Sequence, residues 1–138
     1  MWVIQNMVRG VLLREGRVLV ARATPSLTFL PGGHLEKGET AAACLARECL
    51  EEFGAQVSVG ALLGGVESRY FDDGQTVHQL DLLLEATLSD PEVGRREPHL
   101  TFFWAELDDL DALNLRPVAS QAVIRGQNRG PLMTDWEP

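Results

Sequence analysis

The chain has 138 residues, of which 45% are hydrophobic and 23% are charged, and its formal net charge at pH 7 is −8. This length predicts a single domain over residues 1–138 with an ordinary globular composition. The net negative charge excludes non-specific binding to nucleic acid and docking on an anionic membrane, because both need a basic surface.

The first elements along the chain are two short runs of β-forming residues, 7–13 and 18–22. They predict a hairpin whose turn contains Gly16 at positive φ. A loop is expected over residues 23–28. A short extended piece then ends in the paired glycines at 32–33, where the backbone can approach a ligand closely.

A helix over residues 41–53 is the strongest prediction in the chain. Thr40 is a typical N-cap residue, and Gly54 is a typical C′ residue. Apolar side chains fall on one face at helical spacing, and three carboxylates share a narrow sector of the opposite face: Glu48, Glu51 and Glu52. Neighbouring like charges on a helix repel by about 0.2–0.5 kcal/mol per pair. The face is therefore either a solvated acidic surface or a site for Mg²⁺ or Mn²⁺, which prefer oxygen ligands.

The second half of the chain predicts several strands and two short helices. Strands are expected over residues 57–59, 61–69, 77–88 and 100–104, with a bulge at Gly64–Gly65 and a hairpin turn at 72–75. A polar loop over 89–98 separates the last two. Helices are expected over 107–113 and 117–125, with Pro117 near N1. Residues 126–138 lack periodicity and are expected to form a loose or docked tail.

The stretch from Gly33 to Ala55 resembles the Nudix box, the signature of the Nudix hydrolases. It reads G, five residues, E, seven residues, then R-E-x-x-E-E-x-G, and the spacing is intact. The matching fixed positions are Gly33, Glu39, Arg47, Glu48, Glu51, Glu52 and Gly54. Cys49 and Ala55 occupy slots where the family prefers Ile, Leu or Val. With strands on both sides of one central helix, the resemblance implies an α+β fold, an α/β/α sandwich with a mixed β-sheet between helices.

The resemblance also implies an activity: attack of metal-activated water on the diphosphate of a nucleoside diphosphate linked to another group. The implied metal ligands are the Gly33 carbonyl and the carboxylates of Glu48, Glu51 and Glu52, with Mg²⁺ or Mn²⁺ as the ion. Arg47 and Glu39 are expected to tie the loop to the helix. The general base is either Glu48 or an acid on a later loop, for which Glu97 is the candidate.

Five residues beside the predicted strands are candidates for binding the rest of the substrate: Arg9, Arg22, Arg69, Tyr70 and Phe71. An arginine there could hold a phosphate, and an aromatic ring could stack on a base. A residue of each of these kinds is more often ordinary surface or core. Nucleotide, ADP-ribose-type and dinucleoside polyphosphate substrates all stay open.

Two alternatives share the resemblance. A non-catalytic Nudix-fold nucleotide sensor would commonly lack box carboxylates, which are complete here. An isomerase on the same fold would need a cysteine elsewhere, since both cysteines, Cys44 and Cys49, lie in the box helix.

The two cysteines point in directions too far apart around the helix to form a disulfide with each other, so a reduced cytoplasmic setting is expected. No 18-residue apolar run or signal pattern occurs. A homodimer stays open, because Trp2 and residues 133–136 offer apolar groups.

Overall fold

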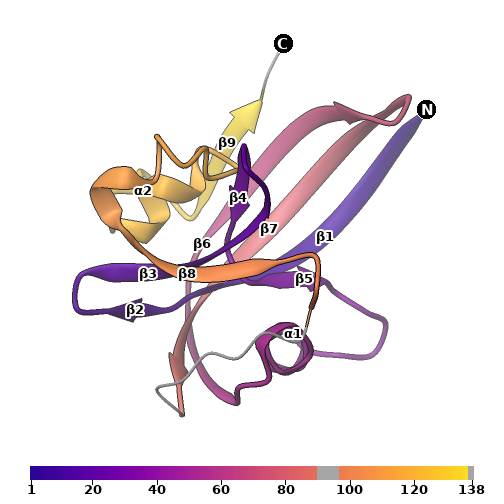
Figure 1. The fold of residues 1–138 in the computed structure, drawn as a ribbon. Coiled ribbons are helices and arrows are strands. Elements are labelled where there is room, and N and C mark those ends of the chain that lie inside the picture. The colour runs from indigo at the N-terminus through magenta and orange to yellow at the C-terminus, as the bar shows by residue number, and fades with distance from the viewer. Residues whose placement is uncertain (90–96, 137–138) are drawn as a thin grey trace.

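The computed structural model describes residues 1–89 and 97–136, which form two β-sheets with helices packed against them (Figure 1). The larger sheet has five strands in the order β5-β1-β7-β6-β9. In chain order these strands are β1 (Trp2–Val11), β5 (Gly32–His34), β6 (Val57–Asp72), β7 (Gln75–Leu88) and β9 (Leu132–Trp136). The pairs β1–β7 and β6–β9 are parallel and the others are antiparallel, so the sheet is mixed.

The smaller sheet is antiparallel and centred on β3, which pairs with each of the other three strands. Its strands are β2 (Leu13–Arg14), β3 (Arg17–Thr24), β4 (Leu27–Phe29) and β8 (Thr101–Glu106). The turn between β2 and β3 has positive φ at Glu15 and Gly16. This is the expected two-residue hairpin geometry.

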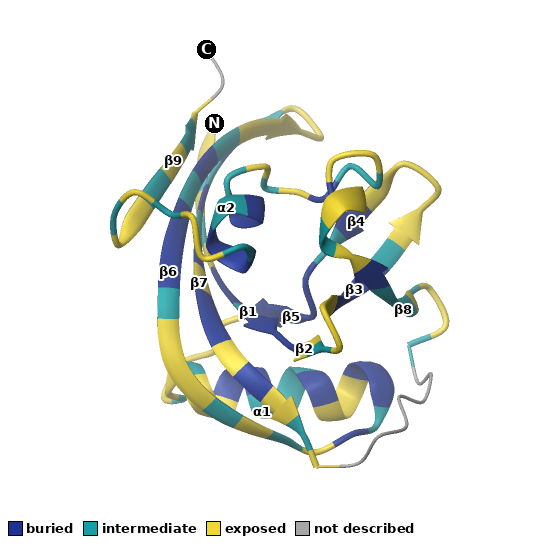
Figure 2. Cartoon of the chain, turned by 90° about the vertical axis from the view of Figure 1, so that its left-hand side faces the viewer, coloured by how far each residue is buried: buried dark blue, intermediate teal, exposed yellow. Residues whose placement is uncertain are grey.

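Two helices pack on opposite faces of the larger sheet: α1 (Ala41–Phe53) and α2 (Ser120–Ile124). Successive residues of a strand point to opposite faces, and β7 illustrates the division. Leu83 belongs to the cluster that contains Val123 of α2, whereas Leu84 belongs to the cluster that contains Leu45 of α1. Figure 2 shows α2 between the two sheets and α1 across one end. The predicted α+β fold with a mixed sheet between helices is confirmed.

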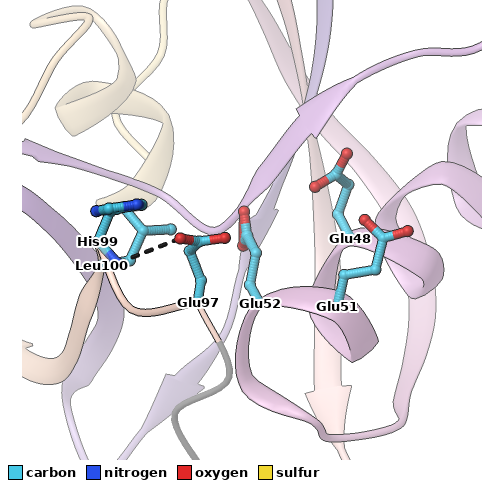
Figure 3. Close-up of a pocket in the computed structure, with 6 residues that line it drawn as sticks. All are labelled: Glu48, Glu51, Glu52, Glu97, His99 and Leu100. Carbon is cyan, nitrogen blue, oxygen red and sulfur yellow. Dashed lines mark hydrogen bonds between the residues drawn. The ribbon is translucent and has the colours of Figure 1, made fainter.

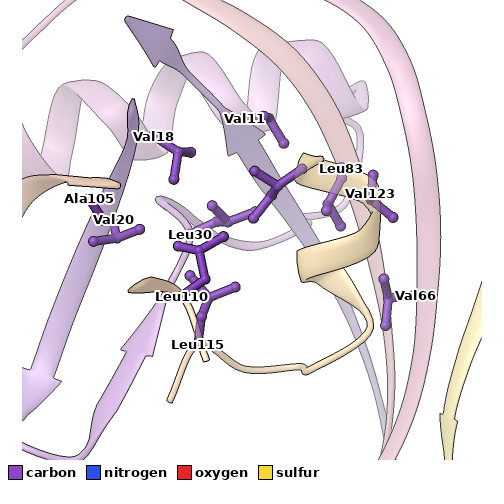
Figure 4. Close-up of a cluster of buried hydrophobic side chains, with 11 residues drawn as sticks. Val11, Val18, Val20, Leu30, Val66, Leu83, Ala105, Leu110, Leu115 and Val123 are labelled. Carbon is purple, nitrogen blue, oxygen red and sulfur yellow. The ribbon is translucent and has the colours of Figure 1, made fainter. Parts of the chain in front are cut away.

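The cluster between the sheets is built from β-branched and leucine side chains (Figure 4). Val18 and Val20 of β3, together with Leu110 and Leu115, are fully buried in it. Each such side chain stabilises the fold by about 1.5–3 kcal/mol relative to an exposed one. This cluster fixes the smaller sheet against the inner face of β6 and β7. In the described part of the chain, no helix is long and apolar enough to cross a membrane.

The sequence-based strand and turn predictions hold in part. The hairpin turn between β6 and β7 lies where expected, with positive φ at Asp73 and Gly74. The irregular pairing of β6 falls between Val59 and Gly64, just before the glycine pair predicted to bulge. The first predicted strand instead divides: β1 joins the larger sheet, and only the short β2 pairs with β3. The expected loop over 23–28 contains the end of β3 and the start of β4.

The C-terminal predictions need correction. The helix expected over 107–113 is a 3₁₀ turn at Leu107–Asp109, and the helix expected over 117–125 is reduced to α2, so Pro117 lies ahead of it. The segment expected to be a loose or docked tail contains β9, which pairs in parallel with β6. Most of the polar loop predicted over 89–98 lies outside the described residues.

Candidate functional site

The acidic face of α1 is held by well-capped helix ends. The Thr40 hydroxyl accepts a hydrogen bond from the Ala43 amide at 3.1 Å, and Gly54 adopts the left-handed conformation with its amide donating to the Leu50 carbonyl. The opposite face of the helix is anchored by buried Leu45 and Phe53. Both caps and the apolar face match the sequence prediction, so the helix presents its carboxylates from a rigid support.

Arg47 joins the helix to the preceding loop. Its Nε and Nη2 donate to the two carboxylate oxygens of Glu39 at 3.1 and 2.8 Å, a bidentate pair. Its Nη1 donates to Glu48 at 3.0 Å and to Glu51 at 3.3 Å, and Nη2 also reaches the His34 carbonyl at 3.2 Å. The hydrogen bonds from Arg47 lower the pKa of Glu39 to about 2. A planar fork of donors makes this set of contacts where a lysine ammonium could not.

The paired glycines bring the backbone of β5 close to α1 and β1. A Cβ on Gly33 would lie 2.5 Å from the Glu48 carboxylate, and a Cβ on Gly32 would lie 1.9 Å from the Val8 carbonyl oxygen. Gly32 also has φ of 139°, which L-residues rarely adopt. Pairing of Gly33 with Val8 of β1 then fixes the loop backbone against the sheet.

Four carboxylates meet at one cleft of about 320 Å³ (Figure 3). The cleft is lined by Glu48, Glu51, Glu52, Glu97, His99 and Leu100. Glu97 is tied to the helix end because its amide donates to the Glu52 carbonyl at 3.1 Å. Its carboxylate accepts a hydrogen bond from the His99 amide at 3.2 Å. Figure 3 shows the Glu97 and Glu52 side chains rising next to each other into the same space.

Glu52 is the most buried of these acids, with 8% of its surface exposed. Burial raises its pKa to about 8, and the neighbouring charge of Glu48 adds to the rise. The Gly32 amide, which donates to Glu52 at 3.3 Å, and the more distant Arg9 oppose it. A carboxylate in this setting is ionised at neutral pH only if further positive charge is brought to it.

The donor set suits a hard divalent cation. As the side chains stand, no three acidic, histidine or cysteine groups within residues 1–89 and 97–136 are grouped so as to hold a metal ion. Glu48 and Glu51 are both turned toward Arg47. Carboxylate and backbone carbonyl oxygens are nonetheless the ligands that Mg²⁺ and Mn²⁺ prefer. The raised pKa of Glu52 and the close approach of Gly33 to Glu48 both fit a cation placed among them.

A second pocket, of about 620 Å³, lies between the two sheets on the inner face of the larger one. Its lining comes from β1, β4, β6, β7, β9 and the segment before α2: Arg9, Leu27, Phe29, Ser68, Arg69, Tyr70, Phe71, Asp72, Gln79, Arg116, Pro117 and Asp135. Arg9 links it to the acidic cleft. Its β1 position pairs with Gly32, and its charge acts on Glu52.

At this second pocket, a chain of hydrogen bonds leads from the partly exposed Tyr70 to the buried side chains of Gln79 and Asp81. Tyr70 Oη donates to Gln79 Oε1 at 2.9 Å, and Gln79 Nε2 donates to Asp81 Oδ1 at 2.7 Å. Arg9 Nε reaches Asp81 Oδ2 at 3.4 Å. Burial raises the pKa of Asp81, and the Arg9 guanidinium acts against that rise. Burial likewise raises the pKa of Tyr70, which favours the neutral phenol.

Four of the five candidate substrate residues line the second pocket: Arg9, Arg69, Tyr70 and Phe71. Arg22 lines neither of these two cavities. Its guanidinium lies over the Phe103 ring at 4.7 Å, on the smaller sheet. Sequence reasoning missed Ser68, Gln79 and Asp81. The available signal was the alternation of β7, which places Gln79 and Asp81 on the same face as the core residue Leu83.

Comparison with known proteins places these features in a family context. The family model described as the NUDIX domain matches residues 5–125. The chain is 33% identical over 134 residues to a Mycobacterium tuberculosis (strain CDC 1551 / Oshkosh) protein named as a candidate mutator protein, MutT4. That match covers 88% of this chain and 49% of the relative, so the chain spans about half the length of this curated relative.

Solved structures share the fold. The crystal structure of a MutT NUDIX hydrolase from Burkholderia pseudomallei has a TM-score of 0.70 and 25% identity, with 91% of this chain and 99% of that chain covered. An ADP-ribose pyrophosphatase from Streptococcus suis has a TM-score of 0.66 and 15% identity, with 96% and 98% covered. The resemblance found in the sequence between Gly33 and Ala55 therefore extends over most of the chain, with the family model ending ahead of β9.

Proposed function

Because the chain belongs to the Nudix hydrolase family, we propose that it is a metal-dependent pyrophosphohydrolase. Its substrate is a nucleoside diphosphate linked to another group, cleaved by attack of water on phosphorus. The observation that carries the proposal is the cleft in which Glu48, Glu51, Glu52 and Glu97 meet. So many carboxylates in one cleft are costly unless cations join them there.

The box residues divide into ligands and supports. Glu48, Glu51, Glu52 and the Gly33 carbonyl would hold Mg²⁺ or Mn²⁺. A bound divalent cation would neutralise the diphosphate and lower the pKa of the attacking water. Arg47 and Glu39 would keep the glycine loop in register with α1, since they bond each other in a bidentate pair. They position the reacting groups and take no proton.

The general base is one of two acids. Glu97 is supported by its place at the rim of the cleft, where its backbone is bonded to the end of α1. Glu48 is supported by its place on the helix beside Gly33. Either carboxylate would accept the proton of the attacking water, a role that typically contributes 10²–10⁴-fold to the rate.

The second pocket is the proposed site for the nucleoside part. Tyr70 lies on its wall with part of its ring exposed, and this ring could stack on a base. The alternation of β6 turns the exposed Phe71 side chain toward the outer face, the face of Glu67. Arg9 lies between this pocket and Glu52, where a guanidinium could contact a phosphate. A protein of the same fold is named as an ADP-ribose pyrophosphatase, so ADP-ribose-type compounds are tested beside nucleotides. Dinucleoside polyphosphates complete the set to be tested.

The test is phosphate release from a panel of these compounds with Mg²⁺, Mn²⁺ or EDTA, with a phosphatase added to reveal monoester products. Cleavage of one class that is abolished by EDTA is the expected result, and it would name the substrate as well. Tight binding without cleavage of any compound, under every metal condition, would overturn the hydrolase proposal and favour a nucleotide sensor. We further propose a cytoplasmic location, which cell fractionation would test. Light scattering would show whether the chain forms a homodimer.

A further inference from the structure

The hydrogen-bonded chain at the second pocket has a fixed direction. Asp81 is 1% exposed and faces the permanently charged Arg9, so its carboxylate acts as an acceptor on both oxygens. The Gln79 amide must therefore turn its nitrogen toward Asp81, and its oxygen then faces Tyr70. The direction follows from the acceptor at the buried end.

This direction determines what Tyr70 offers to a ligand. A phenol has one hydrogen to donate, and Tyr70 gives it to Gln79. Only acceptor lone pairs of Tyr70 Oη are left for a group in the pocket. Because Tyr70 and Gln79 both line the cavity, this polarity is presented at the surface that a ligand would contact.

A second polar group of interest in the same pocket is the Ser68 hydroxyl. Ser68 is 5% exposed and lines the cavity, and its hydroxyl has no hydrogen-bond partner among the described residues. A buried hydroxyl without a partner costs about 1–3 kcal/mol. The Ser68 oxygen is itself shielded from the cavity, so it is not presented to a ligand as the side chain stands. The polar group with a fixed direction that the pocket offers is therefore Tyr70 Oη, an acceptor.

We propose that the second pocket selects nucleobases that present an exocyclic amino group, and that Asp81 sets this preference through Gln79 and Tyr70. Adenine and cytosine each carry an amino group beside a ring nitrogen that accepts. Hypoxanthine and uracil carry an oxygen in place of that amino group, which would face the lone pairs of Tyr70. The proposal rests on the proposed function only in taking the pocket as the nucleoside site; Asp81 is a positioning residue.

The proposal predicts an inversion of preference in Asp81→Asn. Arg9 would hold the oxygen of the introduced side-chain amide, so the nitrogen of that amide would face Gln79. The Gln79 amide would then flip and donate to Tyr70, which releases the phenol hydrogen into the pocket. A keto oxygen would now be favoured. A merely structural loss at Asp81 would weaken all bases alike and could not reverse their order.

The experiment uses the full chain and two matched base pairs, adenine against hypoxanthine and cytosine against uracil. Dissociation constants of the nucleoside monophosphates AMP, IMP, CMP and UMP are measured by calorimetry, and kcat/KM is measured for the corresponding diphosphate compounds. The wild type should prefer the amino base about tenfold in each pair, the ratio for one well-formed hydrogen bond. Tyr70→Phe should reduce the ratio to about one, and Asp81→Asn should bring it below one.

Glu67→Gln is the matched control, because Glu67 lies on the same strand as Ser68 and Tyr70 but bonds His78 on the outer face. It should leave the ratio unchanged. Equal affinity of the wild type for both members of each pair would overturn the proposal, as would an amino preference that survives in Tyr70→Phe. Binding of a nucleoside monophosphate does not require cleavage. The dissociation constants therefore report the base preference even if the protein proves not to be a hydrolase.

Discussion

At the scale of single residues, Arg47 connects several groups of the acidic site. Its guanidinium bonds Glu39, Glu48, Glu51 and the His34 carbonyl at once. It therefore offsets repulsion among the helix acids and holds the glycine loop against the helix. Removing one of its partners should loosen that connection before it alters the fold.

The Glu39–Arg47 pair predicts a pH-dependent contribution to stability. The pKa of Glu39 is about 2 in the fold, below its ordinary value of 4.5. Its stabilising effect is therefore present above about pH 4.5 and lost as the pH falls toward 2. Urea denaturation should find Glu39→Gln less stable than the wild type at pH 7, with a difference that shrinks below pH 4.5. A difference that stays constant from pH 7 to 3 would contradict the assignment.

Glu52→Gln tests the proposed metal ligands. The change keeps the shape of the side chain and removes the charge that would bind the cation. We expect kcat to fall by about 10³-fold or more, because metal-assisted charge stabilisation is worth several kcal/mol. Steady-state rates with Mg²⁺ measure this, and Glu85→Gln, at an exposed position of β7, is the control. Near-normal rates in Glu52→Gln would refute the ligand role.

Glu97→Gln separates the two candidates for the general base. If Glu97 accepts the proton, kcat should drop by about 100-fold, the low end for loss of a general base. An unchanged kcat in Glu97→Gln would instead assign the proton to Glu48.

At the scale of elements, α1 and its loop were predicted from sequence because their determinants are local. The Thr40 cap, the Gly54 terminus and the spacing of the acids all lie within one continuous stretch. The strand pairing was harder to predict. β1 could pair with β3 or with β7 on sequence pattern alone, and the ten-residue parallel register with β7 depends on residues far along the chain. The residues of β9 are only exposed or half-buried, so this short segment cannot be told from a tail until its pairing with β6 is known.

The glycine loop predicts a localised loss of activity. A Cβ added at Gly33 would lie 2.5 Å from Glu48, so the Glu48 carboxylate must move away. We expect Gly33→Ala to reduce kcat by about 100-fold, the low end for loss of a proton-transfer group, while the melting temperature changes little, since the displaced atoms end a flexible side chain. In Gly60→Ala the nearest atoms are 3.6 Å away, and both quantities should stay near wild type. Equal activity in the two variants would show that Glu48 need not lie against Gly33.

At the scale of the whole molecule, the last strand holds several parts together. The Gly65 amide donates to the Pro131 carbonyl at 2.7 Å, and Asp135 accepts from the Val118 amide at 2.8 Å. Met133 packs on the cluster between the sheets. Asp135 of this strand also lines the second pocket. The hydrogen-bonded chain at that pocket could not be predicted from sequence, because it joins β1, β6 and β7, and Arg9 and Asp81 are 72 residues apart.

Removing residues 131–138 should therefore affect both stability and substrate binding. We expect the melting temperature to fall by about 5–10 °C, which corresponds to a loss of roughly 1–3 kcal/mol in a domain of this size. KM should rise more than kcat falls, since the acids of α1 are untouched. Scanning calorimetry and steady-state kinetics measure the two effects, with Thr134→Ala as a control that keeps the strand. An unchanged KM would exclude β9 from the substrate site.

The second pocket draws its walls from distant parts of the chain, from Arg9 on β1 and Asp135 on β9. Chains leave the ribosome N-terminal end first. All residues that line the acidic cleft have emerged once Leu100 is free, whereas the pocket still lacks Arg116, Pro117 and Asp135. A nascent chain thus holds the groups proposed for cleavage before it holds the whole wall proposed to recognise a base. On this proposal, base selectivity would be completed later in synthesis than the groups for catalysis.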